Sequence, residues 1–190
     1  MAGKNIQQKS REMMVKLDLI TKKNDECYTP KYAIEPILEY IPDNSTVWCP
    51  FDTIESNYVK LLKDKGYDVV YSHISDGKDF FNYFPKEHIE YIISNPPYSL
   101  KADVFERLFW LKVPFAMLVG VVGLFESQRR FKLFANNPFE IMYLNKRVSF
   151  FNDFTDVRPK LNPPFSSVYL CSGVLPNQIV FKTIDKLREK

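Results

Sequence analysis

The order of strands and helices predicted along this chain indicates an α/β fold, built on a doubly wound, mostly parallel sheet with helices on both faces. Two observations predict it. Short β-rich runs alternate with amphipathic segments of nine or more residues, which are long enough to cross over between parallel strands. An apolar run at residues 91–93 also stops at two prolines, so a stiff turn follows a strand. In sheets of this kind, ligands bind at the carboxyl ends of the strands.

The amino-terminal part predicts two amphipathic helices. Residues 10–23 place Met13, Leu17 and Ile20 on one helical face, and residues 31–41 repeat this spacing with further apolar side chains. Both segments therefore have one face that must pack against other elements.

From residue 47 onward, strands and helices alternate. Residues 47–49 form the first predicted strand, and a helix over residues 57–65 is ended by Gly66, a residue type common just after helices. The later elements are predicted in order as a strand at 68–72, a further element at 78–84, strands at 91–93 and 115–119 flanking a helix at 102–110, a helix at 127–136, a strand at 141–144, and final strands at 167–171 and 178–181.

Length and composition predict one domain over residues 1–190, with residues 1–25 as an extension containing the first helix and no separate target-recognition domain. The chain has 190 residues, of which 45% are apolar and 26% charged, as expected of a folded domain with one sizeable core. Trp48 and Trp110 lie on apolar faces and are expected in that core.

Charge, cysteine and histidine content restrict the classes of partner. A net charge of +3 permits a nucleic-acid partner without requiring one. The cysteines Cys27, Cys49 and Cys171 are widely spaced, which predicts a reducing cytoplasm and neither a disulfide framework nor a zinc site. With two histidines, no metal centre is expected. We also expect no membrane span and no signal peptide, since the longest apolar run, residues 113–125, is about half a span.

The turn after residues 91–93 is the segment that points most directly to chemistry. Asn95 precedes a proline and is restricted to extended backbone, while Pro96 and Pro97 fix two further φ angles. The side-chain oxygen of Asn95 and the carbonyl of Pro96 can accept both hydrogens of one planar NH2 group. Tyr98 offers a ring on which a base can stack. The turn therefore predicts a site that holds an amine by position and by fixed dipoles, with no charged base required.

The sequence Ser94-Asn95-Pro96-Pro97-Tyr98 resembles the catalytic motif of S-adenosylmethionine-dependent amino methyltransferases, especially the DNA adenine-N6 enzymes and their short phage-encoded members. The resemblance covers, with gaps, most of the chain from Tyr28 onward. It implies a Rossmann-like methyltransferase sheet, S-adenosylmethionine as cofactor, DNA as substrate, and Asn95 to Tyr98 as catalytic residues. It also implies the cytoplasm of a bacterium or of a phage-infected host, and it leaves the oligomeric state open.

The resemblance further implies a cofactor site ahead of Asn95. One segment before the second helix is similar to the one that caps the methionine end of the cofactor, residues 49–56 stand in the place of the cofactor loop, and a later Asp-Phe pair looks like the one that contacts the adenine. The residue after the second strand falls where the ribose is usually bound. The implied cofactor residues are Tyr28, Thr29, Pro30, Pro50, Phe51, Asp52, Ser56, His73, Asp79 and Phe80.

The cofactor loop departs from the family pattern. Thr53 and Glu55 stand where glycines are usual, and no glycine occurs between Gly3 and Gly66. The departure supports an alternative from another class, a catalytically inactive methyltransferase-like module that binds nucleic acid. Two enzymatic alternatives also stay open, methylation of adenine in RNA and methylation of a glutamine amide in a protein, because both acceptors present a planar NH2 group.

Two further features concern the substrate. Basic residues after the catalytic turn and after two later strands are candidate phosphate contacts, although solvated helix ends and loops explain them equally well; they are Lys101, Arg129, Arg130, Lys146 and Arg147. The second feature is Asn162-Pro163-Pro164-Phe165, which nearly repeats the catalytic turn but follows a polar, proline-broken stretch at residues 157–161. It is predicted to be a connecting loop, with lining of the substrate cleft as the alternative.

Overall fold

The structure is a computed structural model that describes residues 28–152, 156 and 158–186. The predicted helix at residues 10–23 and Cys27 lie outside the described residues. The described part folds around one seven-stranded sheet with the strand order β2-β1-β3-β4-β6-β5-β7. The strands are β1 (Thr46–Cys49), β2 (Asp68–Tyr71), β3 (Tyr91–Ser94), β4 (Phe115–Gly120), β5 (Glu140–Leu144), β6 (Ser167–Ser172) and β7 (Ile179–Lys182).

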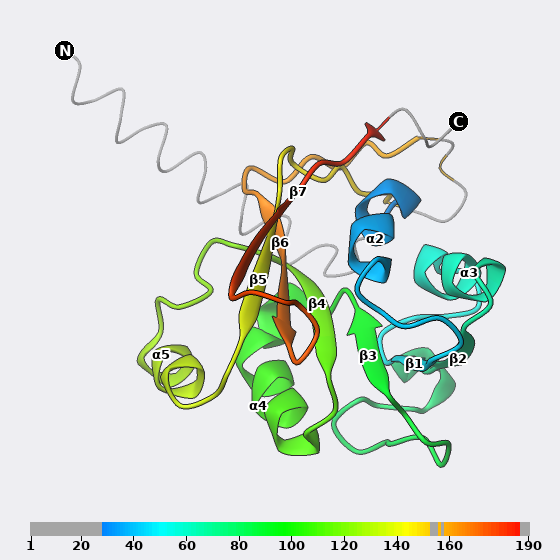
Figure 1. Ribbon diagram of the computed structural model, residues 1–190, viewed down its shortest axis with the longest axis horizontal. Coiled ribbons are helices and arrows are strands. Elements are labelled where there is room, and N and C mark those ends of the chain that lie inside the picture. Colours follow the sequence, from blue (N-terminus) through cyan, green and yellow to red (C-terminus); the bar gives the residue numbers. More distant parts are fainter. Residues whose placement is uncertain (1–27, 153–155, 157, 187–190) are drawn as a thin grey trace.

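The sheet is mostly parallel, which confirms the predicted α/β class. Strand β1 pairs in parallel with β2 and β3, β3 with β4, and β5 with β7. Strand β6 is the exception, because it lies antiparallel between β4 and β5 (Figure 1). The sequence predicted the two final strands but not this insertion, since a local pattern of side chains carries no information on strand direction.

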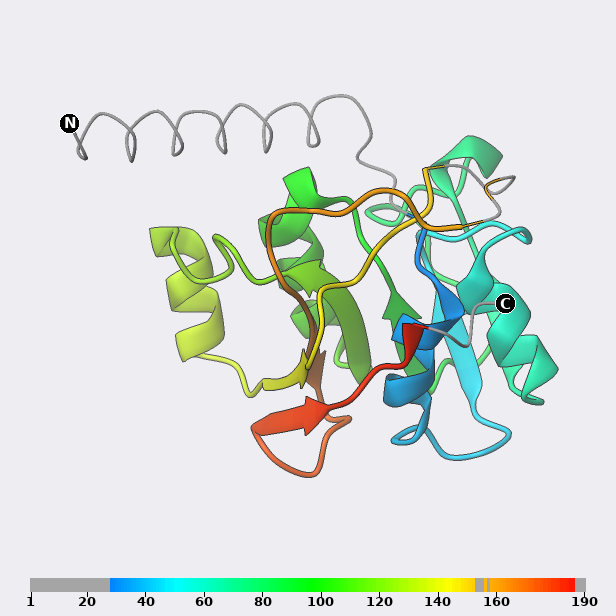
Figure 2. The same cartoon turned by 90° about the horizontal axis from the view of Figure 1, so that it is seen from above.

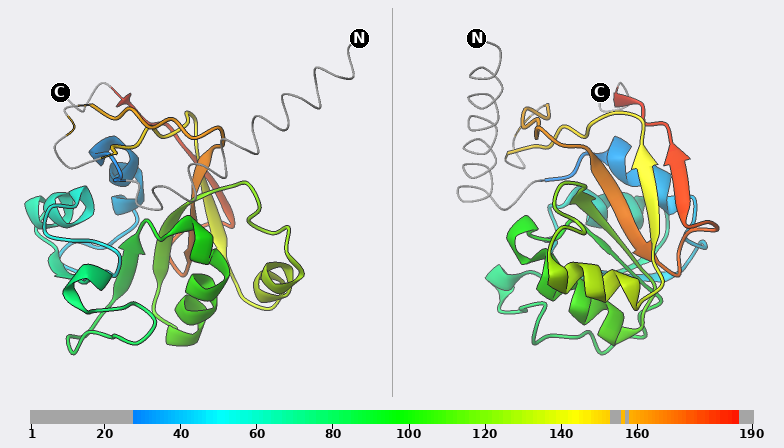
Figure 3. Two further views of the ribbon diagram at one scale, coloured as in Figure 1. Left: turned by 180° about the vertical axis from the view of Figure 1, so that it is seen from behind. Right: turned by 90° about the vertical axis from the view of Figure 1, so that its left-hand side faces the viewer.

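Helices cover both faces of the sheet, as Figures 1 and 3 show. On one face, α2 (Lys31–Leu38) and α3 (Asn57–Asp64) pack on alternate side chains of the strands. On the other face, α4 (Lys101–Leu111) and α5 (Gln128–Ala135) pack on the remaining strand side chains. Two short 3-10 turns, η1 (Ile74–Asp76) and η2 (Tyr98–Leu100), follow β2 and β3.

Local chemistry explains most of the element ends. The Ser56 side chain caps α3 by accepting from the Tyr58 N–H, and Gly66 follows that helix with a φ of 86°, which suits a residue without Cβ. Helix α2 contains Pro36 and ends at Leu38, three residues earlier than predicted, so its last residues form a turn.

Two predictions, one about residues 78–84 and one about Trp110, were wrong. Residues 78–84 form turns and loop, neither helix nor strand. Trp48 is fully buried as expected, but Trp110 is 73% exposed, because it lies on the outer side of α4, with its ring beside Arg107.

The direction in which successive strands are added to the sheet reverses at β1. From β1 the chain crosses through α3 to β2 on one side, and it then returns to β3 on the other side and continues into α4 on the opposite face of the sheet. Strands β4 and β5 run in the same direction as β1 and β3, and their carboxyl ends therefore share one edge of the sheet. Such a switch in strand order is the usual ligand position in parallel α/β sheets.

The connection between β5 and β6 crosses this edge. It leaves the sheet towards the start of α2, as its yellow-to-orange trace shows in Figure 2, and Phe151 forms an isolated antiparallel bridge with Tyr28 there. No helix within residues 28–152, 156 and 158–186 is long and apolar enough to span a membrane.

Candidate functional site

A pocket lies at the carboxyl edge of the sheet, where the loops after β1, β2 and β3 meet. Its cavity volume is about 150 Å³, room for about ten groups the size of a water molecule. The lining residues are Tyr28, Thr29, Pro50, Phe51, Asp52, Thr53, Ser56, His73, Ile74, Asp79, Phe80, Phe81, Asn95, Pro97 and Leu100.

Nine of the ten residues expected to bind a cofactor line this one pocket, and Pro30 does not. Of the expected catalytic residues, Asn95 and Pro97 line it, while Pro96 is buried and Tyr98 packs elsewhere. The structure brings the expected residues together, and their roles stay predictions. Sequence reasoning missed Thr53, Ile74, Phe81 and Leu100, although Phe81 directly follows the predicted Asp-Phe pair.

Asp52 is the buried carboxylate of the pocket, with 7% of its surface exposed. It accepts hydrogen bonds from the hydroxyls of Ser56 and Ser94. Burial raises the pKa of Asp52 to about 6, and the two hydroxyls and the nearby His73 oppose the shift. Because Ser94 directly precedes Asn95, Asp52 joins the loop after β1 to the Asn-Pro-Pro-Tyr turn after β3.

The loop at residues 50–56 is built without glycine and without glycine's special backbone. Among the described residues, Asn44 and Lys112 are the non-glycine positions with positive φ, and neither lies in the loop. The side chain of Asp52 and the Ser56 cap hold the loop instead. The missing glycines therefore do not prevent an ordered pocket wall.

Thr53 occupies one of the positions where the family pattern has glycine. Its Oγ1 atom is buried, lines the pocket and forms no hydrogen bond with any residue that the structure describes. A buried hydroxyl without a partner is costly unless a ligand or water satisfies it. Thr53 thus gives the pocket lining a buried hydroxyl that has no partner among the described residues.

Part of the pocket lining is aromatic. The rings of Phe51 and Phe80 lie 4.8 Å apart between centroids, and Phe81 contacts Phe80 at 5.4 Å. The carboxylate of Asp79 accepts from the Phe81 backbone N–H at 3.0 Å and from the Asn82 amide at 2.8 Å. These bonds fix the 79–82 turn, so the pocket combines a rigid aromatic wall with a polar floor.

His73 is placed by its own backbone turn. Its Nδ1 accepts from the Ser75 N–H at 3.2 Å and thereby caps η1. The ring is also a pocket wall. The structure therefore gives His73 a local structural role beside any contact with a ligand.

The Asn-Pro-Pro-Tyr turn begins where β3 ends at Ser94. Asn95 is half-buried, and Tyr98 starts the short turn η2. The Tyr98 ring packs edge-on against Phe165, with centroids 5.8 Å apart and planes at 71°. The second Asn-Pro-Pro segment, at residues 162–165, is a loop as predicted and reaches the first one through this ring contact.

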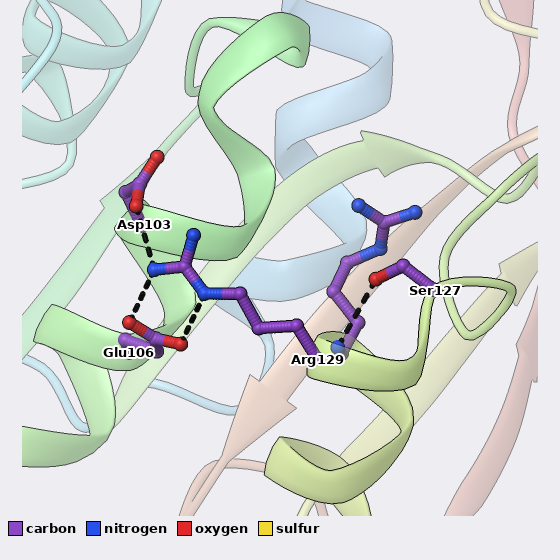
Figure 4. Close-up of polar contacts among 5 residues, drawn as sticks. Asp103, Glu106, Ser127 and Arg129 are labelled. Atoms are coloured by element: carbon purple, nitrogen blue, oxygen red, sulfur yellow. Dashed lines mark hydrogen bonds and ion pairs between the residues drawn. The ribbon is translucent and has the colours of Figure 1, made fainter.

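The basic residues expected to contact nucleic acid differ in their surroundings. Arg129 on α5 donates to Glu106 at 2.6 Å and to Asp103 at 2.7 Å, and both carboxylates lie on α4 (Figure 4). Hydrogen bonds from Arg129 lower the pKa of Glu106. Arg129 therefore ties the two helices together while two acidic groups offset its charge.

The other four basic residues follow the carboxyl ends of β3, β4 and β5, which is the edge of the sheet where the pocket lies. Lys101 donates to the carbonyl of Gly120 at 3.3 Å, and its Nζ lies 5.3 Å from the Tyr98 ring centroid. Arg130 donates to the Leu124 carbonyl at 3.1 Å. Lys146 and Arg147 are exposed directly after β5.

The described residues contain no group of three or more His, Cys, Asp or Glu side chains that could hold a metal ion. Within the same residues, Cys49 and Cys171 are buried free thiols. The side chains that line the pocket include carboxylates, hydroxyls, an amide and aromatic rings.

Comparison with known proteins gives a likeness in fold. No family model matches the chain, and no curated protein matches it. Among solved structures, it is similar to a protein described as a modification subunit of a type I restriction enzyme from Vibrio vulnificus YJ016. The TM-score is 0.50 at 13% sequence identity, over 91% of this chain and 50% of the other. The chain thus spans about half of that subunit, and at this identity the match shows a shared fold.

Proposed function

We propose that this chain is a methyltransferase that transfers a methyl group from S-adenosylmethionine to the N6 amine of adenine in DNA. Its framework is the doubly wound, Rossmann-like sheet that the sequence predicts. The observation that carries the proposal is the position of Asn95, which lines the same pocket as Asp52 and the aromatic wall. The likeness in fold to a restriction-enzyme modification subunit supports it independently.

The pocket fits the methyl donor in its chemistry. We assign the adenine ring to the aromatic wall around Phe80 and Asp79, and the ammonium group at the methionine end to Asp52 and the hydroxyl of Thr53. The buried hydroxyl of Thr53 is a polar group that such a ligand would satisfy, and the buried carboxylate of Asp52 would gain a cationic partner beside the hydroxyls of Ser56 and Ser94. When bound, S-adenosylmethionine supplies an electrophilic methyl group on positively charged sulfur.

The chain's own residues hold and orient the acceptor. Asn95 Oδ1 and the Pro96 carbonyl accept the two N–H groups of adenine, which aims the nitrogen lone pair at the donor. Tyr98 stacks on the base, which must first leave the duplex. The prolines Pro96 and Pro97 and the Ser94–Asp52 hydrogen bond fix the turn before a ligand arrives, so the preorganised acceptors act by position.

Phosphate contacts are assigned to the exposed side of the same edge. Lys146 and Arg147 follow β5 and are exposed, whereas Arg129 is paired with two carboxylates. Of the five basic candidates, we therefore expect Lys146 and Arg147 to contribute most to affinity for DNA. Such contacts set affinity and register, and they carry no sequence choice.

The experiment that tests the function is transfer of a labelled methyl group to unmethylated DNA, RNA and protein in parallel. We expect label on adenine N6 in DNA, and loss of labelling in the Asn95→Ala variant. Label on RNA or on a glutamine amide would show that DNA is not the substrate, and it would still support the amine-binding role of the turn. Labelling of none of the three would contradict the proposal.

Thermal melting separates the enzyme from the inactive binding module. A ligand that binds the folded state raises the melting temperature. We expect saturating S-adenosylmethionine to raise it for the wild type and to have a smaller effect on the Asp52→Asn variant. No shift at millimolar cofactor, together with binding of DNA in a gel shift, would favour the inactive module.

A further inference from the structure

Phe165 is a buried aromatic residue that contacts the candidate catalytic turn from another part of the chain. It is 7% exposed, and its ring meets Tyr98 in an edge-to-face arrangement with 5.8 Å between centroids. Such geometry is favourable because the positive edge of one ring faces the negative face of the other. Each ring is the fourth residue of an Asn-Pro-Pro-aromatic segment.

Gly120, the last residue of β4, leaves the space that Phe165 fills. A Cβ atom at position 120 would lie 2.5 Å from Phe165 Cε2 and 2.7 Å from its Cδ2. The φ angle of Gly120 is not positive, so its lack of a side chain serves the close approach and not a special backbone. Any other residue there would displace the Phe165 ring.

The second turn itself is anchored on both sides. Its Asn162 accepts from the Ser149 hydroxyl at 2.6 Å and donates to the Lys160 carbonyl at 3.1 Å. The Val121 N–H donates to the Ser166 carbonyl at 3.0 Å, which fastens the segment to the end of β4. With two prolines in between, Phe165 has little freedom to move.

Lys101 contacts Tyr98 as well. Its Nζ lies 5.3 Å from the Tyr98 ring centroid, and the same ammonium donates to the carbonyl of Gly120. The Tyr98 ring thus contacts one aromatic ring and one cation, and both of these side chains also contact Gly120 at the end of β4. Lys101 lies three residues after Tyr98, whereas Phe165 comes from a distant part of the sequence.

We propose that Phe165 is a positioning residue that sets the ring plane of Tyr98, and that Gly120 is required for it to do so. This inference rests on the proposed function, in which Tyr98 is the platform for the extruded base. A misoriented platform would place the amine away from the acceptors of Asn95 and Pro96. Phe165 therefore acts on methyl transfer through Tyr98, without lining the cofactor pocket.

The kinetic test is a double-mutant cycle between the two rings. We expect Phe165→Leu to lower kcat by about 10- to 100-fold, and to leave the melting shift produced by S-adenosylmethionine unchanged. In a Tyr98→Ala background, the same substitution is expected to have little further effect on kcat, because the ring that it positions is gone. Equal losses of kcat in both backgrounds would overturn the proposal.

A matched control removes a buried phenylalanine from the other face of the sheet. Phe134 on α5 is 4% exposed and packs against Phe105 at 5.4 Å between centroids. Phe134→Leu should lower the stability of the protein. At a temperature where the variant stays folded, its kcat should equal that of the wild type. A loss of kcat as large as that of Phe165→Leu would attribute both effects to general loosening of the core.

A second measurement does not depend on activity, so it separates this inference from the function. In a protein with labelled tyrosine, both Phe165→Leu and Gly120→Ala should shift the NMR ring signals of Tyr98, and Phe134→Leu should leave them in place. Unchanged Tyr98 signals in the two variants would overturn the positioning role. Shifted signals without methyl transfer by the wild type would preserve the positioning role and reject the proposed function.

Discussion

Two segments of this protein carry nearly the same four residues, yet they differ in what surrounds their asparagines. Asn95 is half-buried at the end of the parallel strand β3 and lines the pocket. Asn162 is exposed in the β5–β6 connection, where Ser149 and Lys160 engage its amide. Nearly the same residues therefore make a pocket-lining turn in one place and a structural anchor in the other.

The difference comes from the preceding residue as much as from the turn. Ser94 is a buried strand residue that donates to the Asp52 carboxylate. Leu161, before the second turn, forms an isolated bridge with Phe150. The first turn follows a strand at the carboxyl edge of the sheet, beside a switch in strand order, where ligands usually bind in such sheets. The second turn does not follow such a strand.

The largest effect is expected at the first asparagine. Asn95→Ala removes an acceptor that the substrate amine needs, and methyl transfer should fall by about 100- to 1,000-fold. The variant should fold, because Asn95 lies at the surface of the pocket and outside the core clusters. Labelled transfer assays measure the activity of the variant, and circular dichroism spectra check its fold. If the variant kept most of its activity, the first turn would not differ from the second in function.

The carboxylate behind the first turn predicts a pH effect on stability. The pKa of Asp52 rises from 3.8 to about 6 on folding, so the folded state holds this proton more tightly than the unfolded state between those values. The stabilisation from the protonated form is full below pH 4 and is lost as the pH rises through 6. The loss is about 3 kcal/mol in the free energy of unfolding.

Chemical denaturation of the wild type and Asp52→Asn between pH 4 and pH 7 measures this effect. The wild type should lose stability relative to the variant over that window. Parallel curves for the two proteins would show that Asp52 does not carry the predicted proton.

The tyrosine of the first turn is expected to act through its ring. Tyr98→Ala should weaken transfer by about 1–3 kcal/mol, the usual contribution of one stacked base. Tyr98→Phe keeps the ring and should keep most of the activity. Equal losses of kcat/KM in the two variants would assign the effect to the hydroxyl.

The smallest effect is expected at the second asparagine. Asn162→Ala removes the acceptor of the Ser149 hydroxyl and should lower the free energy of unfolding by about 1 kcal/mol. The prolines and the bond between Val121 and Ser166 still hold Phe165, so methyl transfer should largely persist. A loss of activity as large as that of Asn95→Ala would make both turns part of the reaction site.

The sequence predicted what local patterns determine. The strand before Asn95 and the helix at residues 57–65 follow from side-chain period and from the glycine after the helix. The grouping of the cofactor residues was implied by the family resemblance, and nine of the ten line one pocket. Parallel strands bring their carboxyl ends to one edge, so residues distant in sequence could be expected in one pocket.

Other features depend on long-range packing that local patterns do not encode. The antiparallel direction of β6 is one such feature, and the exposure of Trp110 is another. The carboxylate partners of Arg129 lie 23 and 26 residues earlier in the chain. Phe165 contacts Tyr98 because the β5–β6 connection returns across the edge of the sheet. Local sequence patterns do not predict the path of this connection.

The most direct test of the central claim measures methyl transfer to unmethylated DNA by the wild type, Asn95→Ala and Asn162→Ala in one assay. We expect labelled adenine N6 with the wild type, nearly as much with Asn162→Ala, and a loss of at least about 100-fold with Asn95→Ala. Equal activity of the two variants, or no transfer by the wild type, would contradict it.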